Sequence, residues 1–511
     1  MSEMIVYKTP TFEFYESFPY KQNIIAKKEN NHNLYYLEVQ NENVLKLNCE
    51  KFKGNLFEYQ KEDVEKIINN NRLLIAHETG LGKTIMMITT ILNLQEFNYE
   101  NLPILIVAPK TILNNWKNEI AKHTNYTTSI LPDTSGQIWL STYARVRISV
   151  EKLKEKNFFI LISDEANFLK NIKAKQTKAF AELKAKYKYL LTATPIKNSP
   201  TEVYSLAKIL DCSQYLFGNY WNFLNQYGEK GRIHTKTGIR EVIVGYKNLP
   251  ELKDKIKTIM IKRDKSDEKV IKDIGKLGYI SKEIFVDLSS IQKSIENGIE
   301  NEIEKINERE KYLNSYDEIK RKEILEEIYK EKLPYYSLNR ILTSTAGAWN
   351  RSTNILKKNI YEGEIEYENN KIEEVVRIIN DEVQNNEQVV IFTNYIESVE
   401  EISKKLNQED IKCVSASSNN NYIEEIEKFK QDKSIKALVM TNVGKYGINL
   451  QNASYLIFFD LPYTFAEVEQ LIGRIVRVGQ QNVPIIYTLI SGKLELEVYN
   501  GIIRKKEWNI I

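Results

Sequence analysis

The sequence is poor in cysteine and contains no pattern that would hold a structural metal. Its three cysteines, Cys49, Cys212 and Cys413, are far apart in a chain of 511 residues, and none belongs to a Cys-x-x-Cys pair. Structural zinc sites need clusters of cysteine and histidine, so we expect no zinc site here. A sparse and odd number of cysteines is typical of a reducing compartment, where disulfides are rare.

Long apolar runs are also missing from the sequence. No segment approaches the roughly eighteen consecutive apolar residues that indicate a membrane-spanning helix. The first ten residues already contain Glu3 and Lys8 and lack the apolar core of a secretory signal. We therefore expect a soluble, intracellular protein that has no membrane partner.

A large excess of charge of one sign is absent, because 72 basic residues face 69 acidic ones and the net charge is +3. This balance neither requires nor excludes a nucleic-acid partner, since a protein can confine its basic surface to one groove. Two stretches are locally basic: residues 170–188, with seven lysines and the single acidic residue Glu182, and residues 253–265, which contain Lys262 and Arg263. Each is either a solvated surface or a set of phosphate contacts that reads no base sequence.

Two blocks of the chain share a rhythm of short apolar runs separated by longer helical patterns. This rhythm predicts parallel βα units, because fully buried parallel strands read as continuous apolar runs. The fold class we expect is therefore α/β, with two similar parallel-sheet lobes. The runs are residues 73–76, 104–108, 138–142, 158–163 and 189–193 in the first block, and 389–393, 411–415, 437–441, 455–459 and 485–489 in the second.

The segments outside these blocks have different patterns. Alternating polar and apolar residues near the N-terminus predict a small β-rich appendage, and the Glu- and Lys-rich residues 291–332 have the apolar spacing of solvated helices. No long Pro-, Gly- or Ser-rich linker separates the parts. The boundaries we predict are an appendage over residues 1–50, a first lobe over 51–210, a largely helical insertion over 211–370 and a second lobe over 371–511.

The first block contains a candidate phosphate-binding loop. The apolar run 73–76 precedes a loop with two glycines, and the helical pattern 85–94 follows it. A strand, a glycine-containing loop and a helix form the context in which a P-loop is credible. Gly80 and Gly82 would let backbone amides approach a phosphate, and the helix N-terminus would add partial positive charge.

Two side chains at the end of this loop are candidates for binding ATP and Mg²⁺. Lys83 would reach the β- and γ-phosphates, and the hydroxyl of Thr84 would coordinate Mg²⁺. The strict pattern has a glycine at the position of His77, so the loop alone is an incomplete match.

A carboxylate pair lies well downstream of the loop. The apolar run over residues 158–162 leads directly to Asp164 and Glu165. A buried strand that delivers two adjacent carboxylates at its carboxyl end is typical of the second half of an NTPase site. Asp164 would hold Mg²⁺, and Glu165 would act as the general base that polarises the attacking water.

Together these motifs resemble the superfamily 2 helicase-like ATPases, and most closely those of the Swi/Snf type, over residues 55–503. The segment 56–60 is similar to the family's L-x-x-Y-Q, in which the glutamine, here Gln60, reads adenine. The resemblance implies two RecA-like lobes, with ATP and Mg²⁺ as cofactors. The loop that resembles the family's M-G-L-G-K-T consists of Thr79, Gly80, Leu81, Gly82, Lys83 and Thr84.

The second block carries the most specific match. Residues 470–480 resemble Q-x-x-x-R-x-x-R-x-G-Q, which implies nucleotide binding by Gln470 and catalytic arginine fingers at Arg474 and Arg477. Residues three apart share one face of a helix, and a guanidinium fork suits a phosphate better than an ammonium does. If both arginines are fingers, hydrolysis requires both lobes to close.

Other segments match the family with departures. The resemblance implies nucleic-acid contact for residues 106–119 and a nucleotide-coupled linker at 191–198. Asn167 stands where relatives have histidine, which implies altered coupling, and Lys445 stands in place of the second glycine of a Gly-Gly pair.

The function that these motifs predict is an ATP-driven translocase on nucleic acid, and the resemblance implies double-stranded DNA as its track. A strand-separating helicase and the motor subunit of a restriction-type complex stay open as alternatives, as does a nucleotide-binding scaffold without turnover. The chain lacks chromatin-binding modules, which favours the cytoplasm of a bacterium or of an infected host cell over a nucleus. Its protein partners cannot be identified from the residues.

Overall fold

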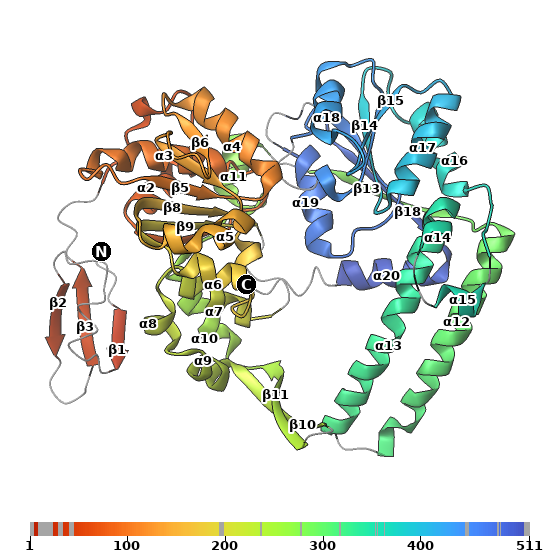
Figure 1. Ribbon diagram of the computed structural model, residues 1–511, viewed down its shortest axis with the longest axis horizontal. Helices are drawn as coiled ribbons and strands as arrows, with labels where there is room; N and C mark the ends of the chain where they lie inside the picture. The colour runs from red at the N-terminus through yellow and green to blue at the C-terminus, as the bar shows by residue number, and fades with distance from the viewer. Residues whose placement is uncertain are drawn as a thin grey trace.

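Two lobes built on parallel sheets lie side by side (Figure 1). A small antiparallel sheet near the N-terminus accompanies them. The structure is a computed structural model. It describes residues 5–8, 24–28, 34–39, 45–193, 199–235, 238–275, 278–315, 318–352, 354, 356–361, 363–444, 449–477, 480 and 482–504.

Lobe 1 contains a sheet of seven strands, and every neighbouring pair in it is parallel. The carboxyl ends of all seven strands therefore meet at one edge, where ligands bind in open α/β sheets. In spatial order the strands are β12 (Met260–Ile261), β4 (Arg72–Ile75), β9 (Lys184–Leu191), β8 (Asn157–Asp164), β5 (Ile104–Val107), β7 (Ile138–Ser141) and β6 (Thr128–Ile130).

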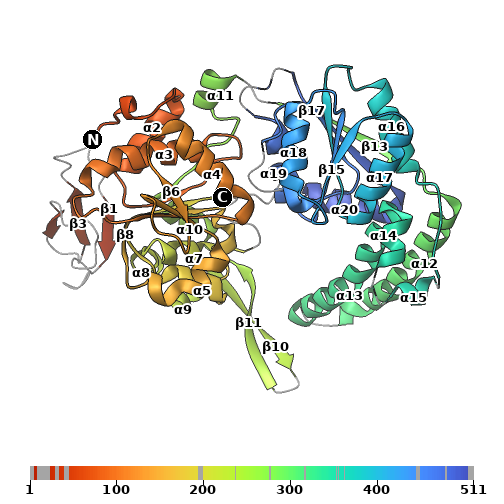
Figure 2. The same ribbon diagram turned by 45° about the horizontal axis from the view of Figure 1, so that its top comes forward.

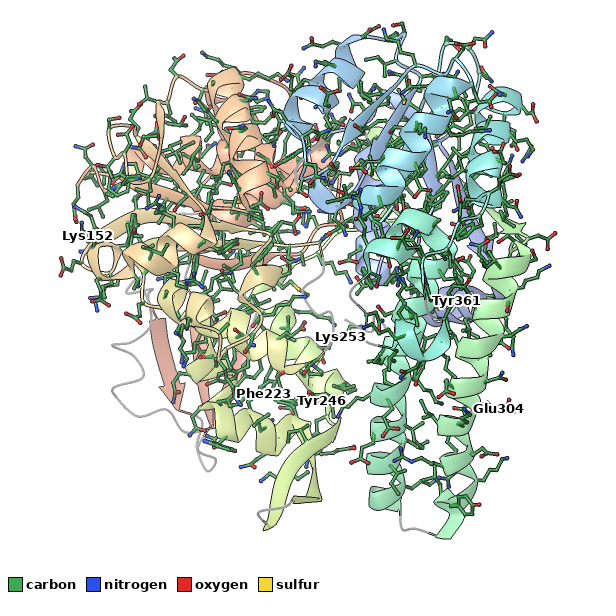
Figure 3. The ribbon with its side chains drawn as sticks, turned by 45° about the vertical axis from the view of Figure 1, so that its right-hand side comes forward. Lys152, Phe223, Tyr246, Lys253, Glu304 and Tyr361 are labelled. Atoms are coloured by element: carbon green, nitrogen blue, oxygen red, sulfur yellow. The ribbon has the colours of Figure 1, made fainter. Side chains whose placement is uncertain are left out.

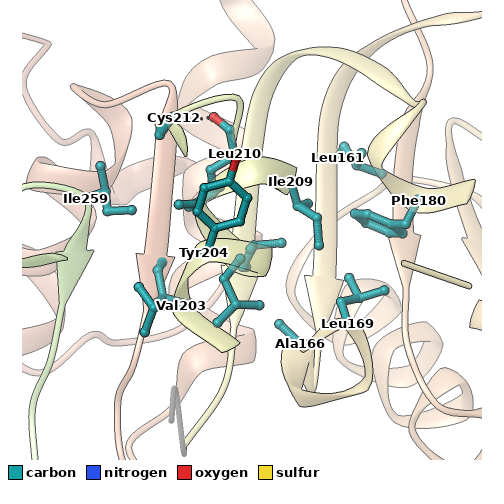
Figure 4. Close-up of a cluster of buried hydrophobic side chains, with 14 of the residues drawn as sticks. Leu161, Ala166, Leu169, Phe180, Val203, Tyr204, Ile209, Leu210, Cys212 and Ile259 are labelled. Carbon is teal, nitrogen blue, oxygen red and sulfur yellow. Dashed lines mark hydrogen bonds between the residues drawn. The ribbon is translucent and has the colours of Figure 1, made fainter. Parts of the chain in front are cut away.

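Helices cover both faces of this sheet. On one face, α2 (Glu58–Ile68), α3 (Lys83–Leu94) and α4 (Lys110–His123) pack in one apolar core. A second core lies on the other face (Figure 4). Its helices are α5 (Tyr143–Leu153), α6 (Lys175–Ala181), α7 (Thr201–Ile209), α8 (Ser213–Phe217), α9 (Tyr220–Tyr227) and α10 (Leu249–Lys257).

The division of the cores follows the two-residue period of a strand. In β5, Ile104 and Ile106 join the core under α2–α4, whereas Leu105 and Val107 join the opposite core. Because both faces are buried, the strand reads as an unbroken apolar run.

Lobe 2 repeats this arrangement with six parallel strands. Helices α16 (Asn370–Asp381) and α17 (Ile396–Gln408) pack on one face, and α18 (Tyr422–Gln431) and α19 (Phe465–Ile475) pack on the other together with α20 (Gly492–Arg504). The strand order is β13 (Ile280–Val286), β18 (Ile485–Ser491), β17 (Ala453–Phe458), β14 (Gln388–Phe392), β16 (Ala437–Met440) and β15 (Cys413–Ala416).

The two-lobed α/β fold predicted from the apolar runs is confirmed, and each of the ten runs overlaps a strand of the expected lobe. One expectation needs correction. Segment 211–370 is not simply a helical insertion, because β12 extends the sheet of lobe 1 and β13 extends that of lobe 2. Both are edge strands, and β13 is largely exposed, so neither has the long apolar run of a central strand.

Two projections extend from the lobes in the same direction (Figure 1). The hairpin of β10 (Gly228–Thr235) and β11 (Gly238–Tyr246) leaves lobe 1, and its strand β10 contacts α13 of the second projection. That projection pairs α12 (Ser290–Asn307) with α13 (Glu318–Ser344), as the helical pattern over 291–332 predicts. Figure 3 labels Tyr246 at the base of the hairpin and Glu304 on α12.

An apolar seam joins these helices to lobe 2. Ile295, Ile299 and Ile303 recur every four residues along α12 and pack with Leu338 and Leu342 of α13. The short helices α14 (Ala346–Arg351) and α15 (Lys357–Ile360) complete this part. Within the described residues, none of the helices has the length and apolar character needed to cross a bilayer.

The N-terminal sheet has three antiparallel strands in the order β1 (Ile5–Lys8), β3 (Leu34–Val39), β2 (Ile24–Lys28). All three strands lie within the appendage, residues 1–50, for which the sequence predicts β structure.

Candidate active site

The phosphate-binding loop joins β4 to α3 at the carboxyl edge of the lobe 1 sheet. Gly80 and Gly82 adopt left-handed backbone conformations, with φ of 90° and 77°, which glycine accepts without strain. Lys83 opens helix α3, and its Nζ donates to the backbone oxygens of His77 and Glu78 at 2.6 and 3.2 Å. Burial lowers the pKa of Lys83 to about 8, an effect that the carboxylates of Glu165 and Asp164 oppose.

The carboxylate pair stands at the end of β8, two strands away from β4. Asp164 and Glu165 are each 7% exposed, and burial raises the pKa of both carboxyl groups. Glu165 has a φ of 54°, which is a left-handed conformation that costs a non-glycine residue about 1–3 kcal/mol. Its Oε2 atom is buried and accepts no hydrogen bond from the described residues.

Three donors fix the position of Asp164. The indole Nε1 of Trp116, on α4, donates to Oδ2 at 2.9 Å, and the backbone N–H of Glu165 donates to Oδ1 at 2.9 Å. The hydroxyl of Tyr143, at the start of α5, donates to the backbone oxygen of Asp164 at 2.6 Å. Trp116 lies in the segment 106–119 that resembles the family pattern, but nothing in the sequence shows that Trp116 or Tyr143 contacts Asp164.

Helix α19 of lobe 2 faces this half-site (Figures 1 and 2). Arg474 is 5% exposed, and its charge acts on Lys83, Asp164 and Glu165. Arg477 lies beside the loop, because a Cβ atom built on Gly80 would be 3.6 Å from its Cγ. Burial lowers the pKa of Arg477 to about 10, and the positive charge of Arg474 adds to the effect.

The two arginines do not share a helix face, which corrects the prediction from their spacing. Helix α19 ends at Ile475, and Val476 leaves the helix with φ −76° and ψ 88°. Arg477 therefore follows the helix, whereas Arg474 lies in its last turn. The sequence has no glycine or proline at this point, so it does not indicate that the helix ends there.

The lobes touch directly where α19 meets the P-loop. A Cβ atom built on Gly473 would lie 2.8 Å from the Cβ of Thr79, a separation that real side chains do not adopt. Thr79 is itself 8% exposed. Glycine at position 473 therefore allows the approach that brings Arg474 to the carboxylates.

The predicted adenine reader, Gln60, lies beneath the P-loop on α2 and is 4% exposed. Its Oε1 accepts the backbone N–H of Phe57 at 3.0 Å, and its Nε2 donates to the backbone oxygen of Leu81 at 3.4 Å. Tyr59 donates to the same oxygen at 3.0 Å. Both ends of the Gln60 amide are thus engaged with the protein. Gln470 is 3% exposed on α19, one turn before Arg474.

The segment that connects the lobes carries a buried ion-pair network. Arg263 donates to both oxygens of Asp63 at 2.5 and 2.8 Å, and Asp63 also bonds Nε2 of His77 at 2.9 Å. Burial alone would raise the pKa of Asp63, but the bonds from His77 and Arg263 outweigh it and lower the pKa to about 2. Glu62 and Asp267 complete the pairing of Arg263.

Neither interpretation of the basic stretch 253–265 fits Arg263. Its side chain is 8% exposed and satisfied by carboxylates, so it is neither a solvated charge nor a free phosphate contact. The backbone oxygen of Arg263 also accepts the N–H of Glu78 at 2.9 Å, and Lys265 pairs with Glu78 at 3.1 Å. The connection between the lobes is therefore fastened to the P-loop. Asp63 lies two hundred residues before Arg263, which no local pattern could reveal.

The basic stretch 170–188 contains both buried and exposed lysines. Lys170 and Lys188 are buried and pair with Glu202 at 3.3 Å and Asp211 at 2.9 Å. Lys173, Lys175 and Lys178 are exposed near the end of β8, whereas Lys184 and Lys186 are exposed at the amino end of β9. A pocket of about 240 Å³ lies beside Lys170 and Lys173. Its lining residues are Lys170, Asn171, Ile172, Lys173, Ser199, Thr201, Glu202 and Tyr220.

Some expected motif residues lie outside the described residues. They are Thr194–Asn198 of the linker segment 191–198, Lys445 at the Gly-Gly position with Gly447 and Ile448 shortly after it, and Gly479 of the segment 470–480. Asn167 is described, and its Oδ1 is buried with no hydrogen-bond partner among the described residues.

Comparison with known proteins relates both lobes to helicases. Residues 27–333 match the SNF2-related domain, and residues 370–479 match the helicase conserved C-terminal domain. An uncharacterized ATP-dependent helicase of Mycoplasma genitalium is 26% identical over 481 residues, which cover 89% of this chain and 42% of the relative. The chain also spans 42% of a second ATP-dependent helicase, from Mycoplasma pneumoniae, and thus less than half the length of both.

Two further proteins extend this relationship. The uncharacterized ATP-dependent helicase YqhH of Bacillus subtilis is 26% identical over 472 residues, which cover 85% of this chain and 75% of the relative. Among solved structures, the Hef helicase domain of Pyrococcus furiosus has a TM-score of 0.51 at 16% identity, covering 87% of this chain and 98% of that one. This last likeness concerns the fold.

The buried network predicts that Arg263→Met is strongly destabilising. Removal of one partner leaves Asp63 buried without its main counter-charge, which costs about 3–5 kcal/mol of unfolding free energy. Urea unfolding of the full chain measures the loss. Arg377→Met is the control, since Arg377 forms an exposed pair with Glu374 that contributes less than about 1 kcal/mol. Equal losses of unfolding free energy in the two variants would contradict the interpretation of Arg263 as the buried counter-charge of Asp63.

The contact between Gly473 and Thr79 predicts that Gly473→Ala separates the lobes without unfolding them. Alanine favours a helix by about 1 kcal/mol over glycine, so α19 itself is not weakened, but the new methyl group collides with Thr79. We expect a larger radius of gyration in X-ray scattering and an undiminished melting temperature. Gly501→Ala, in open space on α20, should scatter like the parent. Unchanged scattering by Gly473→Ala would refute the contact.

Proposed function

Because the chain belongs to the SNF2-related domain family, whose match covers residues 27–333, we propose that it is an ATP-driven motor that moves along nucleic acid, with double-stranded DNA as its track. The observation that carries the proposal is the joining of two half-sites. Lys83, Asp164 and Glu165 come from lobe 1, and Arg474 acts on all three from lobe 2.

Each charged group has a role in hydrolysis. The backbone amides of the P-loop and Lys83 bind the phosphates of ATP. A water molecule attacks the γ-phosphorus, the bond between this atom and the bridging oxygen breaks, and Glu165 accepts the proton of the water. ADP and inorganic phosphate are the products. Arg474 and Arg477 balance the negative charge that the reacting phosphoryl group spreads over its oxygens.

The residues present suit a magnesium ion. The Thr84 hydroxyl and the Asp164 carboxylate would hold it, and both offer the oxygen ligands that Mg²⁺ prefers. In the described part of the chain, no cluster of three His, Cys, Asp or Glu side chains forms a metal cage. Mg²⁺ needs no such cage, because it retains water molecules and uses phosphate oxygens. The ion held there would neutralise part of the negative charge of the nucleotide phosphates.

Adenine recognition requires a local exchange of hydrogen bonds. Gln60 reads the base in this proposal, but its amide bonds Phe57 and Leu81 in the structure. The glutamine side chain is flexible, and in this proposal the base replaces these bonds at the N-terminal end of α2. Gln470 belongs to the same nucleotide site from the side of lobe 2.

Movement follows from the division of the site. Productive hydrolysis needs α19 against the P-loop, since Arg474 reaches the carboxylates only there. Loss of the γ-phosphate removes the charge that attracts Arg474 and Arg477, and the lobes can then separate. Repeated closing and opening shifts the lobes relative to the track, which is how chemical energy becomes displacement.

The track runs along the carboxyl edge of lobe 1 in this proposal. Lys173, Lys175 and Lys178 are exposed there, and the pocket beside Lys173 presents the polar side chains of Asn171 and Thr201. Such groups neutralise phosphates and read no base sequence, so binding falls steeply with salt. The bacterial relatives and the scarcity of cysteine also favour the cytoplasm of a bacterium or of an infected host cell.

ATP turnover of Glu165→Gln tests the proposal. Glutamine preserves the shape of the side chain and removes the base, so we expect kcat to fall by about 100-fold or more while nucleotide binding persists. Glu155→Gln, an exposed substitution before β8, is the control. Duplex DNA should stimulate the parent more than single-stranded DNA or RNA does.

Each other outcome has a distinct meaning. Stimulation by RNA alone would contradict the DNA track, and preferential stimulation by single strands would favour strand separation. No turnover with any nucleic acid would favour a nucleotide-binding scaffold. Unchanged turnover of Glu165→Gln would remove Glu165 from the role of base.

A further inference from the structure

Two aromatic side chains hold Asp164 from opposite faces of the lobe 1 sheet. Trp116 belongs to the core under α2–α4, and Tyr143 belongs to the core on the other face. Both are buried, with 0% and 4% of their surface exposed. The Trp116 indole donates to the carboxylate of Asp164, whereas the Tyr143 hydroxyl donates to its backbone oxygen.

These bonds remove the freedom that an aspartate side chain ordinarily has. The terminal torsion of aspartate has a broad, roughly two-fold energy profile, so an unrestrained carboxylate turns easily. Here one oxygen accepts the indole N–H at 2.9 Å and the other accepts the N–H of Glu165 at 2.9 Å. Two donors in fixed positions define the plane of the carboxylate, and its remaining lone pairs stay available for a cation.

The backbone at the end of β8 is fixed by a separate bond. The Tyr143 hydroxyl lies 2.6 Å from the backbone oxygen of Asp164 and 2.6 Å from Oγ of Ser163. Next to it, Glu165 adopts its left-handed conformation. The Tyr143 bond thus holds the strand end from which both carboxylates project.

An indole has a single hydrogen-bond donor and no acceptor, so the role of Trp116 is narrow. Packing alone would be satisfied by phenylalanine, but a buried donor that faces a carboxylate makes a charge-assisted bond. Glu119, three residues further along α4, lies in the field of Arg477. One face of α4 therefore contacts the carboxylate half of the site and also faces an arginine of lobe 2.

Both helices begin at the edge where nucleic acid is proposed to bind. Helix α4 starts at Lys110, directly after β5, and α5 starts at Tyr143, directly after β7. A displacement of either helix start by a bound phosphate backbone moves a donor of Asp164. Each donor lies close to the start of its helix, because Tyr143 is the first residue of α5 and Trp116 lies in the second turn of α4.

We propose that Trp116 and Tyr143 are positioning residues that orient Asp164 toward the metal-bound nucleotide and transmit nucleic-acid contact from α4 and α5 to it. The inference rests on the proposed function, in which Asp164 holds Mg²⁺ and nucleic acid contacts this edge. In this proposal Lys83 still binds the phosphates and Glu165 still acts as the general base.

Equilibrium binding of a fluorescent ADP analogue to the full chain tests the orienting role. The measured quantity is the ratio of Kd in EDTA to Kd in Mg²⁺, which reports the contribution of the metal and needs no turnover. Loss of a partner that orients a metal ligand costs about 10-fold or more in metal affinity. We expect Trp116→Phe to reduce the ratio by about that factor, and Tyr143→Phe to reduce it as well.

Two matched variants control for the loss of a buried donor in lobe 1. Trp139→Phe removes an indole that donates to the backbone oxygen of Gly136 at 3.0 Å. Tyr189→Phe removes a hydroxyl that donates to the backbone oxygens of Ile67 and Asn70 at 3.1 and 3.0 Å. Neither contacts Asp164, so both should keep the parental ratio.

A ratio for Trp116→Phe equal to that of Trp139→Phe would overturn the proposal. Equal weakening of binding in EDTA and in Mg²⁺ would also overturn it, because the indole would then support only the packing of the lobe. These results are separable from a failure of the proposed function, since the titration proceeds even if no nucleic acid stimulates hydrolysis.

The transmitting role has its own measurement. Repeating the titration with duplex DNA should raise the ratio for the parent and for both controls, whereas Trp116→Phe and Tyr143→Phe should not respond. A parental response to duplex that persists in both variants would overturn this part of the proposal. A parent without any response would contradict the nucleic-acid dependence on which it rests.

Discussion

The close approach of α19 to the P-loop is the constraint on which the site depends. Gly473 packs against Thr79 so tightly that no larger residue fits in this arrangement. One residue further along, Arg474 enters the field of Lys83 and of both carboxylates. Neither lobe contains this set of charges alone, so the geometry of the contact determines whether a complete site exists.

Buried charge of both signs is concentrated around this contact. The charges of Lys83 and Arg474 act on Asp164 and Glu165, and burial lowers the pKa of Lys83 to about 8 and that of Arg477 to about 10. Arg474 is buried, and Lys83 and Arg477 are only partly exposed to solvent. The polyphosphate of a nucleotide carries the negative charge that stabilises such an assembly, and a helix N-terminus already favours an anion there. Closure of the lobes and binding of the nucleotide are expected to reinforce each other.

Much of this arrangement can be predicted from the residues, and the exceptions have physical causes. Parallel strands buried on both faces appear as continuous apolar runs, so the central strands of both lobes are recognisable. Strand β13 is an exposed edge strand that contains the adjacent charges Lys282 and Glu283, and β12 has only two residues, so neither shows this pattern. The pairing of Arg263 with Asp63 is a tertiary contact without local signal.

The candidate site shows the same division. Lys83, Thr84, Asp164 and Glu165 are predictable because each follows a strand at the same edge of a parallel sheet. The position of Arg477 relative to the helix cannot be predicted from the sequence, because α19 ends at Ile475 without a glycine or proline at that point. The bond from Trp116 to Asp164 joins two recognisable motifs, but sequence spacing does not define the distance between them.

The segment that connects the lobes is bonded to the nucleotide-binding part of lobe 1. Arg263 and Lys265 tie the segment after β12 to α2 and to Glu78 of the P-loop, so one end of this segment moves with the nucleotide site. Its other end continues into β13 of lobe 2. The connection between the lobes is thus anchored next to the site that α19 completes.

The most direct test of the central claim is the turnover of Arg474→Ala with duplex DNA at saturating ATP. If lobe 2 completes the site, kcat falls on the order of 1,000-fold, which is typical of the loss of an arginine finger, while binding of ADP to lobe 1 changes little. Arg351→Ala, which removes an exposed ion pair between α14 and Glu397 of lobe 2, keeps the parental rate. A kcat of Arg474→Ala equal to that of Arg351→Ala would contradict the account.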